Sequence, residues 1–261
     1  MSFVVVPQWQ GSPSSRAMRL AEGARAIRAD LPSASTREVE VPLEAGDSAG
    51  TGISRFGAVL TVRERLVHEL AHVSAPAIVI GGDCGVSAGA IAAASADDVA
   101  VVWFDAHPDL NTALTSPSGA FAGMVLASLV EDGTVAGSRV VVAGARAWDE
   151  PEKEFATEHG LRSLSVSEIT ADALVEAVAA TGATRVYVHV DLDVLDPGEF
   201  AGLLTPVPFG VATSDLVAAI RSLCVRFPLA GATIASFAPE SEEAAVDDSA
   251  TILRIIAALR S

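Results

Sequence analysis

Two short runs of residues carry side chains that could bind a divalent metal ion. The first, residues 104–109, reads Phe-Asp-Ala-His-Pro-Asp, and the second, residues 189–197, reads His-Val-Asp-Leu-Asp-Val-Leu-Asp-Pro. Carboxylates held this close together would repel one another strongly unless a cation neutralised them. The pattern therefore predicts a metal site. The alternative interpretation is a pair of acidic loops that cap helices.

The spacing within each run places these side chains on one side of the chain. Asp105, His107 and Asp109 stand at positions i, i+2 and i+4. Asp191 and Asp193 share the i, i+2 relation. Residues two apart in an extended segment project to the same side. Carboxylates with one imidazole suit manganese or a similar divalent ion. Carboxylates that bridge two such ions fit a binuclear site that generates hydroxide from water near neutral pH.

Both runs need a frame that brings two strand ends together. Apolar stretches typical of strands alternate with helical stretches along the whole chain. Strands are expected at 3–6, 37–41, 77–80, 99–104, 139–143, 185–190 and 232–237, and helices at about 15–30, 60–72, 86–94, 123–131, 172–180, 214–223 and 249–259. This alternation predicts an α/β fold with a parallel sheet covered on both faces and a ligand site at the carboxyl ends of its strands. No linker or repeat interrupts it, so residues 1–261 are expected to form one domain.

The composition limits the partners and the compartment. With 17 Lys and Arg against 33 Asp and Glu, the formal charge of −16 argues against nucleic acid or anionic membranes as partners. No apolar run reaches about 18 residues, so no membrane span is expected. The first seven residues lack a basic start and a cleavage site, which favours a cytoplasmic protein. Cys84 and Cys224 stand in unrelated contexts and suggest no disulfide.

Three motifs in sequence order resemble those of the arginase/agmatinase (ureohydrolase) family. They are Gly81-Gly82-Asp83-Cys84, the run from Asp105 to Asp109, and the run from Asp191 to Pro197. The resemblance is strongest over about residues 77–240. It implies a three-layer α/β/α sandwich with a mostly parallel sheet, and hydrolysis of guanidino groups with two Mn²⁺ ions. Trimers and hexamers are common in the family, so a homotrimer or homohexamer is also expected.

The resemblance also implies a set of metal ligands. These would be five side chains of the two runs: Asp105, His107, Asp109, Asp191 and Asp193. Asp105 and Asp191 would bridge the two ions. Asp109 would in addition hydrogen-bond the attacking hydroxide and orient it towards the guanidinium carbon. His189, two residues before Asp191, could face the same site, either supporting a ligand or taking part in catalysis.

Two segments resemble arginases more than agmatinases. In the loop from Asp109 to Gly119, the family resemblance assigns Asn111 and Ser118 to the α-carboxylate of the substrate. An amide and a hydroxyl can each donate a hydrogen bond to such an anion. In the segment 144–149, the resemblance assigns Asp149 to the α-ammonium group. Each of these residues alone could be an ordinary turn residue, but the three together favour an α-amino acid as substrate.

One predicted metal ligand departs from the family pattern. Cys84 stands where the Gly-Gly-Asp-His motif of the family has its His ligand. A thiolate can bind a metal, but it is soft and matches manganese poorly. The site that includes Cys84 is therefore expected to be weak, empty, or filled by zinc, iron or cobalt. The alternative is a buried Cys84 that binds no metal.

Two further departures concern the reactive end of the substrate. Ala122 stands where arginases carry a His that shuttles protons, and such acid–base help is typically worth about 10²- to 10⁴-fold in rate. Ser236 stands where arginases have a Glu that pairs with the guanidinium. Glu240 is four residues further on, beyond Pro239, which makes a direct replacement doubtful.

The amino acid end of the site thus matches arginases, while the guanidinium end differs. A less basic group would need the missing Glu less. We therefore expect a metal-dependent C–N hydrolase that acts on arginine or, preferably, on Nω-hydroxyarginine and releases ornithine and a urea-type product. The alternative is a catalytically impaired relative that binds a metal or an amino acid without turnover. An amide deacetylase of a related fold agrees less well with the second run.

Overall fold

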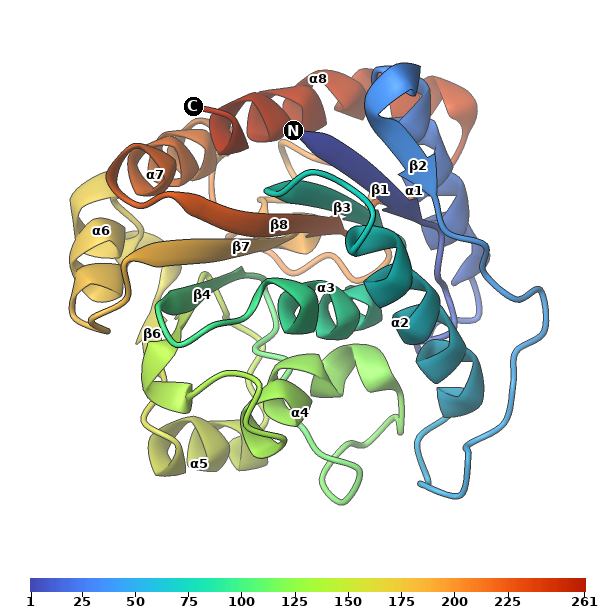
Figure 1. Ribbon diagram of the computed structural model, residues 1–261, viewed down its shortest axis with the longest axis horizontal. Helices are drawn as coiled ribbons and strands as arrows, with labels where there is room; N and C mark the ends of the chain where they lie inside the picture. Colours follow the sequence, from blue (N-terminus) through green and yellow to red (C-terminus); the bar gives the residue numbers. More distant parts are fainter.

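The sheet forms the middle layer of the computed structural model, which describes residues 1–261. Its eight strands follow the order β2-β1-β3-β8-β7-β4-β5-β6, and all neighbouring pairs run parallel (Figure 1). The strands are β1 (Ser2–Val6), β2 (Thr36–Glu38), β3 (Ala77–Gly81), β4 (Val99–Phe104), β5 (Val140–Ala143), β6 (Arg162–Leu164), β7 (Arg185–Asp191) and β8 (Leu229–Ala235).

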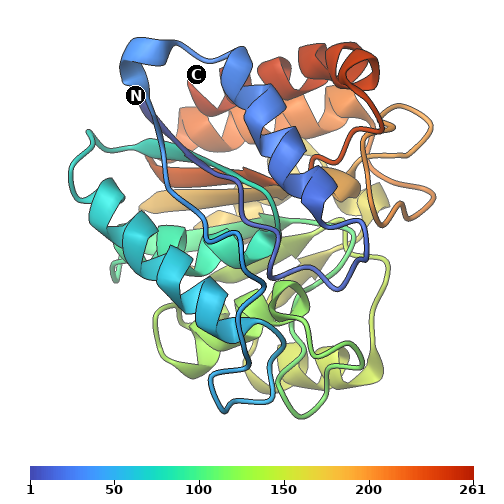
Figure 2. The same ribbon diagram turned by 90° about the vertical axis from the view of Figure 1, so that its right-hand side faces the viewer.

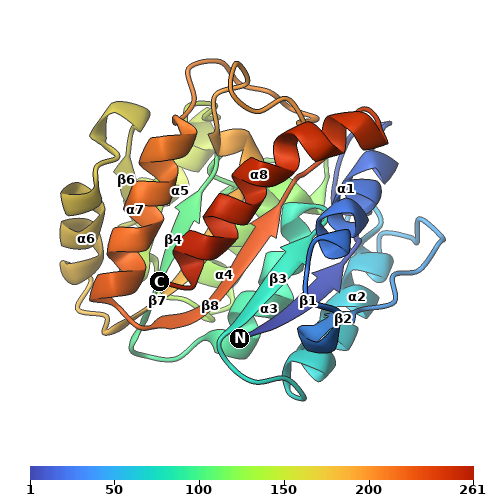
Figure 3. The same ribbon diagram turned by 90° about the horizontal axis from the view of Figure 1, so that it is seen from above.

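Helices cover both faces of the sheet. One layer holds α1 (Met18–Ala29), α6 (Ala171–Ala179), α7 (Thr213–Arg226) and α8 (Glu242–Leu259) (Figure 3). The other layer holds α2 (Phe56–Leu70), α3 (Ser87–Ala94), α4 (Val125–Glu131) and α5 (Glu150–Glu158) (Figure 1). The predicted three-layer α/β/α sandwich is confirmed. None of the helices combines the length and the apolar character needed to cross a membrane.

Alternation along the strands divides the apolar side chains between two cores. Ile78 and Ile80 of β3 belong to the core under α1, α6, α7 and α8, whereas Val79 belongs to the core under α2 to α5. Trp103 and Phe104 of β4 divide in the same way. Both faces are therefore removed from water, which is the usual condition for an all-parallel sheet.

Two elements were not expected from the sequence. Helix α5 buries only Glu152 and Phe155, so its apolar period is too weak to reveal a helix. Strand β6 has three residues, none of them buried, at the edge of the sheet. Helix α8 begins at Glu242, seven residues before the expected start, because its first turns carry acidic residues in place of apolar ones.

The strand order brings distant segments to one edge. Strands β3, β8, β7 and β4 are neighbours, although β3 and β4 follow each other in the chain. The loop 44–55 runs beside the loop 112–119, where Ser54 pairs with Ala120 (Figure 2). Open α/β sheets place their ligand sites where the strand order switches in this way, at the carboxyl ends of the strands.

Candidate metal centre

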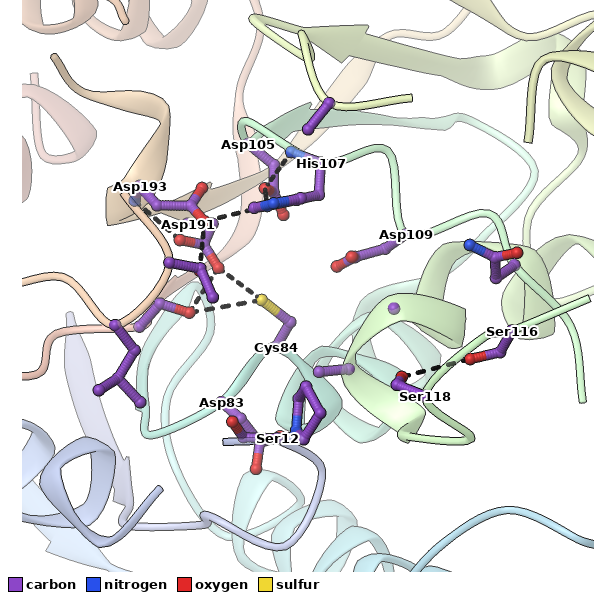
Figure 4. Close-up of a pocket in the computed structure, with 18 of the residues that line it drawn as sticks. Ser12, Asp83, Cys84, Asp105, His107, Asp109, Ser116, Ser118, Asp191 and Asp193 are labelled. Carbon is purple, nitrogen blue, oxygen red and sulfur yellow. Dashed lines mark hydrogen bonds and ion pairs between the residues drawn. The ribbon is translucent and has the colours of Figure 1, made fainter. Parts of the chain in front are cut away.

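A cavity of about 410 Å³ lies at the carboxyl ends of the four central strands (Figure 4). It brings together the nine residues that the sequence predicts as metal ligands or substrate contacts: Cys84, Asp105, His107, Asp109, Asn111, Ser118, Asp149, Asp191 and Asp193. His189 does not line it. Ala122 and Ser236, which with Cys84 depart from the family pattern, also line it. The proposed ligands and the proposed substrate contacts thus share one cavity.

The first run is fixed by hydrogen bonds at the end of β4. Asp105 accepts hydrogen bonds from the backbone N–H of His107 at 2.7 Å and from the indole N–H of Trp103 at 3.1 Å. The Nδ1 atom of His107 lies 3.0 Å from Asp193 Oδ2 and 3.5 Å from Asp105 Oδ1. Asp193 also accepts the backbone N–H of Ala106 at 3.0 Å. The two runs are therefore in direct contact.

Asp191 joins the second run to the ends of β3 and β8. Its Oδ2 atom accepts the Cys84 thiol at 2.7 Å and a short hydrogen bond from the Ser236 hydroxyl. Its Oδ1 atom accepts the backbone N–H of Asp193 at 2.8 Å. Ser236 adopts a left-handed backbone conformation, with φ at 69°, a region that residues other than Gly occupy mainly at turns or strained sites. Three strands thus converge on one carboxylate.

Asp83 holds the segment before Cys84 in place. Its carboxylate accepts hydrogen bonds from the side chain of Gln8 and from the backbone N–H groups of Gly11 and Gly85, each at 2.8 Å. Burial raises the pKa of Asp83 to about 6, although these three donors act in the opposite direction. The first aspartate of the Gly-Gly-Asp-Cys motif therefore ties the end of β3 to the loop after β1.

Two groups of donor atoms are compact enough to hold an ion. One contains Cys84, Asp105, His189 and Asp191, and the other contains Asp105, His107 and Asp193. Within each group, one donor atom per residue lies within 4.8 Å of all the others. Asp105 belongs to both groups, as a bridging carboxylate would. Asp109 lines the same cavity but belongs to neither group.

Burial makes three of the four carboxylates of this centre reluctant to ionise without a cation; the exception is Asp193, where the hydrogen bond and charge of His107 outweigh burial and lower the pKa to about 2. Burial raises the pKa of Asp105 to about 7, and the charge of Asp193 adds to the shift. Burial also raises the pKa values of Asp109 and Asp191 well above the ordinary range. Burial lowers the pKa of His107, but its hydrogen bonds to Asp105 and Asp193 outweigh this effect and raise the pKa to about 12.

The buried side-chain atoms that lack a hydrogen-bond partner all belong to residues of this centre. Only two buried side-chain polar atoms lack a partner, Asp109 Oδ2 and His189 Nε2. Leaving a buried polar atom unpaired costs about 1–3 kcal/mol. A divalent ion, with its bound water, would supply partners and neutralise the carboxylates, so the donor set fits a metal centre.

The part of the cavity that the sequence predicts to bind the amino acid end of a substrate is built around Asn111. Its amide donates to Asp149 Oδ2 at 3.0 Å, and its carbonyl oxygen accepts the Thr115 hydroxyl at 2.9 Å. The sequence did not single out Glu152, which is buried beside them. Glu152 accepts the backbone N–H groups of Asp149 at 2.9 Å and Leu110 at 3.1 Å. The Asp-x-x-Glu spacing that often begins a helix was the available signal for this residue.

Comparison with known proteins decides the family. The model of the arginase family matches residues 12–259, almost the whole chain. The chain belongs to the arginase family. Homologues in this family are hydrolases that act on the C–N bonds of amidines, so membership confirms the predicted class of enzyme.

Individual relatives share the fold and part of the sequence with this arginase-family chain. Arginase from Bacillus subtilis is 32% identical over 193 residues, which make up 66% of this chain and 65% of that protein. The N(omega)-hydroxy-L-arginine amidinohydrolase of Streptomyces lavendulae is 32% identical over 192 residues, or 69% of this chain and 67% of that protein. The matched region therefore spans about two thirds of these relatives. The structure of Entamoeba histolytica arginase with L-ornithine has a TM-score of 0.86 at 23% identity and covers 100% of this chain and 98% of that chain.

Two of the departures from the arginase pattern, Cys84 and Ser236, are neighbours in the cavity. Ser236 lies 3.6 Å from Cys84, measured from hydroxyl oxygen to sulfur. Glu240 lies outside the cavity, exposed to solvent and 3.7 Å from the guanidinium of Arg19. Burial, followed by the charge of Asp191, raises the pKa of the Cys84 thiol well above its ordinary value. No carboxylate therefore takes the place of the Glu that Ser236 replaces.

Proposed function

We propose that residues 1–261 form a single metallohydrolase domain that cleaves an arginine-like amino acid, with Nω-hydroxyarginine preferred over arginine. The products would be ornithine and a urea-type compound. One observation carries the proposal: a single cavity joins an arginase-like amino acid end to a metal centre whose guanidinium end lacks both Glu and His. A relative named for each substrate, an arginase and a hydroxyarginine amidinohydrolase, is 32% identical to this chain, which supports the class of substrate but not the preference between the two.

The proposed roles of the centre combine its donor groups with the family resemblance. His107 and Asp193 would hold one divalent ion, Cys84 and Asp109 would contribute to the second, and Asp105 and Asp191 would serve both. Bound divalent ions, Mn²⁺ in at least one site, would neutralise these carboxylates and activate water near neutral pH. The unpaired Oδ2 of Asp109 would accept a hydrogen bond from the attacking water and direct it to the guanidino carbon.

The amino acid end would position the substrate. Asn111 and Ser118 would donate hydrogen bonds to its α-carboxylate, and Asp149 would accept from its α-ammonium group. Water adds to the guanidino carbon, and collapse of the resulting adduct breaks the bond from this carbon to Nε, which takes up a proton and leaves as the side-chain amine of ornithine. Ala122 cannot supply that proton, so it would have to come from Asp109 or from water, and this step should be slow compared with enzymes that have a His at this position.

The preference for Nω-hydroxyarginine rests on charge. An electron-withdrawing hydroxyl group lowers the basicity of a guanidine, so more of the substrate is neutral at pH 7. A fully charged guanidinium would lie beside the Ser236 hydroxyl, which already donates to Asp191 and offers no compensating negative charge. The neutral form avoids that cost.

The deciding experiment measures ornithine release by the purified protein loaded with manganese or zinc. We expect ornithine from both substrates, with the larger kcat/KM for Nω-hydroxyarginine. The Ser236→Glu and Ala122→His substitutions should shift the preference towards arginine by about tenfold or more, because each restores one missing group. If protein of confirmed metal content releases ornithine neither from arginine nor from Nω-hydroxyarginine, the proposal is refuted.

A second candidate is a protein that binds a metal and an amino acid without turnover. It is favoured by the concentration of Cys84, Ala122 and Ser236 in the same cavity. Titration calorimetry with L-ornithine and L-arginine would then show binding, while a panel of guanidines and amides would show no hydrolysis. Turnover of any member of the panel would exclude this candidate.

A further inference from the structure

His189 is a buried imidazole with one nitrogen unaccounted for. It lies on β7, is completely inaccessible to solvent, and its Nε2 atom has no hydrogen-bond partner. Its Nδ1 atom lies 2.8 Å from the Ser87 hydroxyl at the start of α3. Its ring stacks on Trp103 of β4 with centroids 3.5 Å apart and planes 15° from parallel. The ring is thus fixed in position on both sides.

The remaining environment of His189 points to a ligand. Asp191 is two residues further along β7, so both side chains project from the same face of the sheet. One ring nitrogen of His189, the Cys84 sulfur, and one oxygen each of Asp105 and Asp191 all lie within 4.8 Å of one another. Donors around one zinc ion, at bond lengths of about 2.0–2.3 Å, are separated by no more than about 4.6 Å. Small side-chain shifts would close this group around an ion.

We propose that His189 is a metal ligand and that, with Cys84, Asp105 and Asp191, it forms a zinc site. This inference rests on the proposed metal dependence of the enzyme. The imidazole that the family pattern has at position 84 would be supplied here from β7, while a thiolate takes the original position. With Ser87 accepting the Nδ1 proton, Nε2 presents a lone pair to the ion.

The choice of zinc follows from the donor set. One thiolate, one imidazole and two carboxylates give four ligands of intermediate softness, and zinc is most often bound by four such ligands in a tetrahedron. With His189 as the fourth ligand, Asp109, which belongs to neither compact group, would act on the attacking water alone. The neighbouring group of Asp105, His107 and Asp193 offers only oxygen atoms and one imidazole, which suits manganese. The two sites should therefore differ in preference, with zinc at the Cys84 site and manganese at the His107 site.

The test combines metal counting with the spectrum of Co²⁺, which replaces zinc and absorbs visible light. Wild-type protein stripped with a chelator and given one equivalent of Co²⁺ should show a cobalt–thiolate charge-transfer band and the intense visible bands of four-coordination. His189→Asn keeps an amide near Ser87 but removes Nε2. It should weaken zinc and cobalt binding at this site by at least about 100-fold and abolish the four-coordinate bands, while manganese still binds at the other site.

Two controls separate ligation from support. Ser87→Ala removes only the contact to Nδ1 and should weaken zinc binding by no more than about tenfold. X-ray absorption tests ligation with His189 left intact. The His107→Asn substitution removes the imidazole of the other site, so zinc-loaded protein should show one sulfur and one imidazole around zinc. A folded His189→Asn protein with the cobalt spectrum and zinc affinity of the wild type would overturn the inference, as would a zinc shell without imidazole.

The outcomes also separate this inference from the proposed function. If the cobalt spectrum changes in His189→Asn but the wild type releases no ornithine, the zinc site is supported and the proposed reaction is refuted. If the wild type releases ornithine but the cobalt spectrum is the same in His189→Asn, the reaction is supported and the zinc site is refuted.

Discussion

Asp191 is the carboxylate on which three strands of the centre converge. Its two oxygens accept hydrogen bonds from Cys84, Ser236 and the backbone of Asp193, and it is 3% exposed. In the proposed centre it would serve both ions with one charge. A neutral side chain of the same shape would keep the fold and remove that charge.

Asp191→Asn is expected to weaken divalent metal binding at both sites by at least about 100-fold, because the amide offers no negative charge and a poorer ligand. Metal per chain after equilibrium dialysis is the measurement. Asp196→Asn is the matched control, since Asp196 belongs to the same acidic run but accepts only the backbone N–H groups of Gly198 and Gly210. Wild-type metal content in Asp191→Asn would contradict the proposed ligand set.

Asn111→Ala tests the amino acid end of the cavity. We expect KM for the amino acid substrate to rise about 10- to 100-fold with kcat changed by less than about threefold, because a hydrogen bond to a charged group is lost in both the ground state and the transition state. Leu114→Ala, in the same loop and 97% exposed, should leave both constants unchanged. A fall in kcat at constant KM would place Asn111 in the chemical step instead.

Residues of the site that lie within a sequence motif could be predicted from the sequence. Contacts that depend on the register between two strands could not. The nine predicted residues share one cavity because each follows a strand end that could be located from its apolar run. The stacking of His189 on Trp103 depends on the pairing of β7 with β4, which places these two residues opposite each other. No local pattern contains that information.

At the scale of elements, the loop after β5 is held by one side chain. The guanidinium of Arg146 donates to backbone carbonyls in three segments: those of Gly144, of Asp193, Val194 and Leu195, and of Val207 and Pro208. The distances range from 2.7 to 3.4 Å. The planar fork of an arginine can serve several acceptors that the three donors of a lysine cannot reach together. Arg146 therefore holds the backbone of the second acidic run, residues 189–197, in place.

Arg146→Lys is expected to lower the free energy of unfolding by about 2–4 kcal/mol, because several carbonyls lose a charged donor. Urea denaturation followed by circular dichroism gives this value, and Arg260→Lys, on the exposed end of the chain, is the control. The same substitution should reduce metal binding, since the backbone of Asp193 is one of the acceptors. A stability within about 0.5 kcal/mol of the wild type would show that water replaces the lost donors.

Elements with a strong apolar period were predictable, and those held by polar contacts were not. The central strands β3, β4 and β7 follow the expected bounds to within one residue, because almost every side chain in them is buried and apolar. Helix α5 is positioned through Glu152, whose carboxylate binds the backbone N–H groups of Asp149 and Leu110. A buried glutamate interrupts the pattern from which a helix is usually recognised.

At the scale of the whole molecule, the class of fold followed from the alternation of strands and helices, whereas the strand order did not. Strand β8 pairs with β3, about 150 residues earlier in the chain, and only this pairing brings Ser236 beside Cys84. Local periodicity cannot distinguish this order from other right-handed arrangements of the same strands. The acidic runs at the strand ends predicted a metal site, whereas only the family resemblance indicated that Cys84 and Ser236 belong to it.

The net charge and the buried carboxylates together set the pH dependence of the metal-free protein. Asp105 has a pKa of about 7 in the folded state against 3.8 for the ordinary group, and those of Asp109 and Asp191 are also raised. Between the unfolded-state pKa of 3.8 and the folded-state pKa of about 7, Asp105 binds more protons in the folded chain than in the unfolded chain, so the free energy of unfolding falls as the pH rises. The raised pKa of His107 acts in the same direction above pH 6.5. The formal charge of −16 adds repulsion.

Chelator-treated protein is therefore expected to be less stable at pH 7.5 than at pH 5. Between pH 5 and pH 7.5 the shift of Asp105 alone corresponds to about 2–3 kcal/mol. The matching fall in Tm is roughly 5 °C for a chain of this length. Divalent ions bind the ionised carboxylates, so adding manganese and zinc should raise Tm more at pH 7.5 than at pH 5 and reverse the order of the two values. Calorimetric scans with and without metal at both pH values provide the measurement. A metal-free protein whose Tm rises from pH 5 to pH 7.5 would show that these carboxylates do not retain their protons in the folded chain.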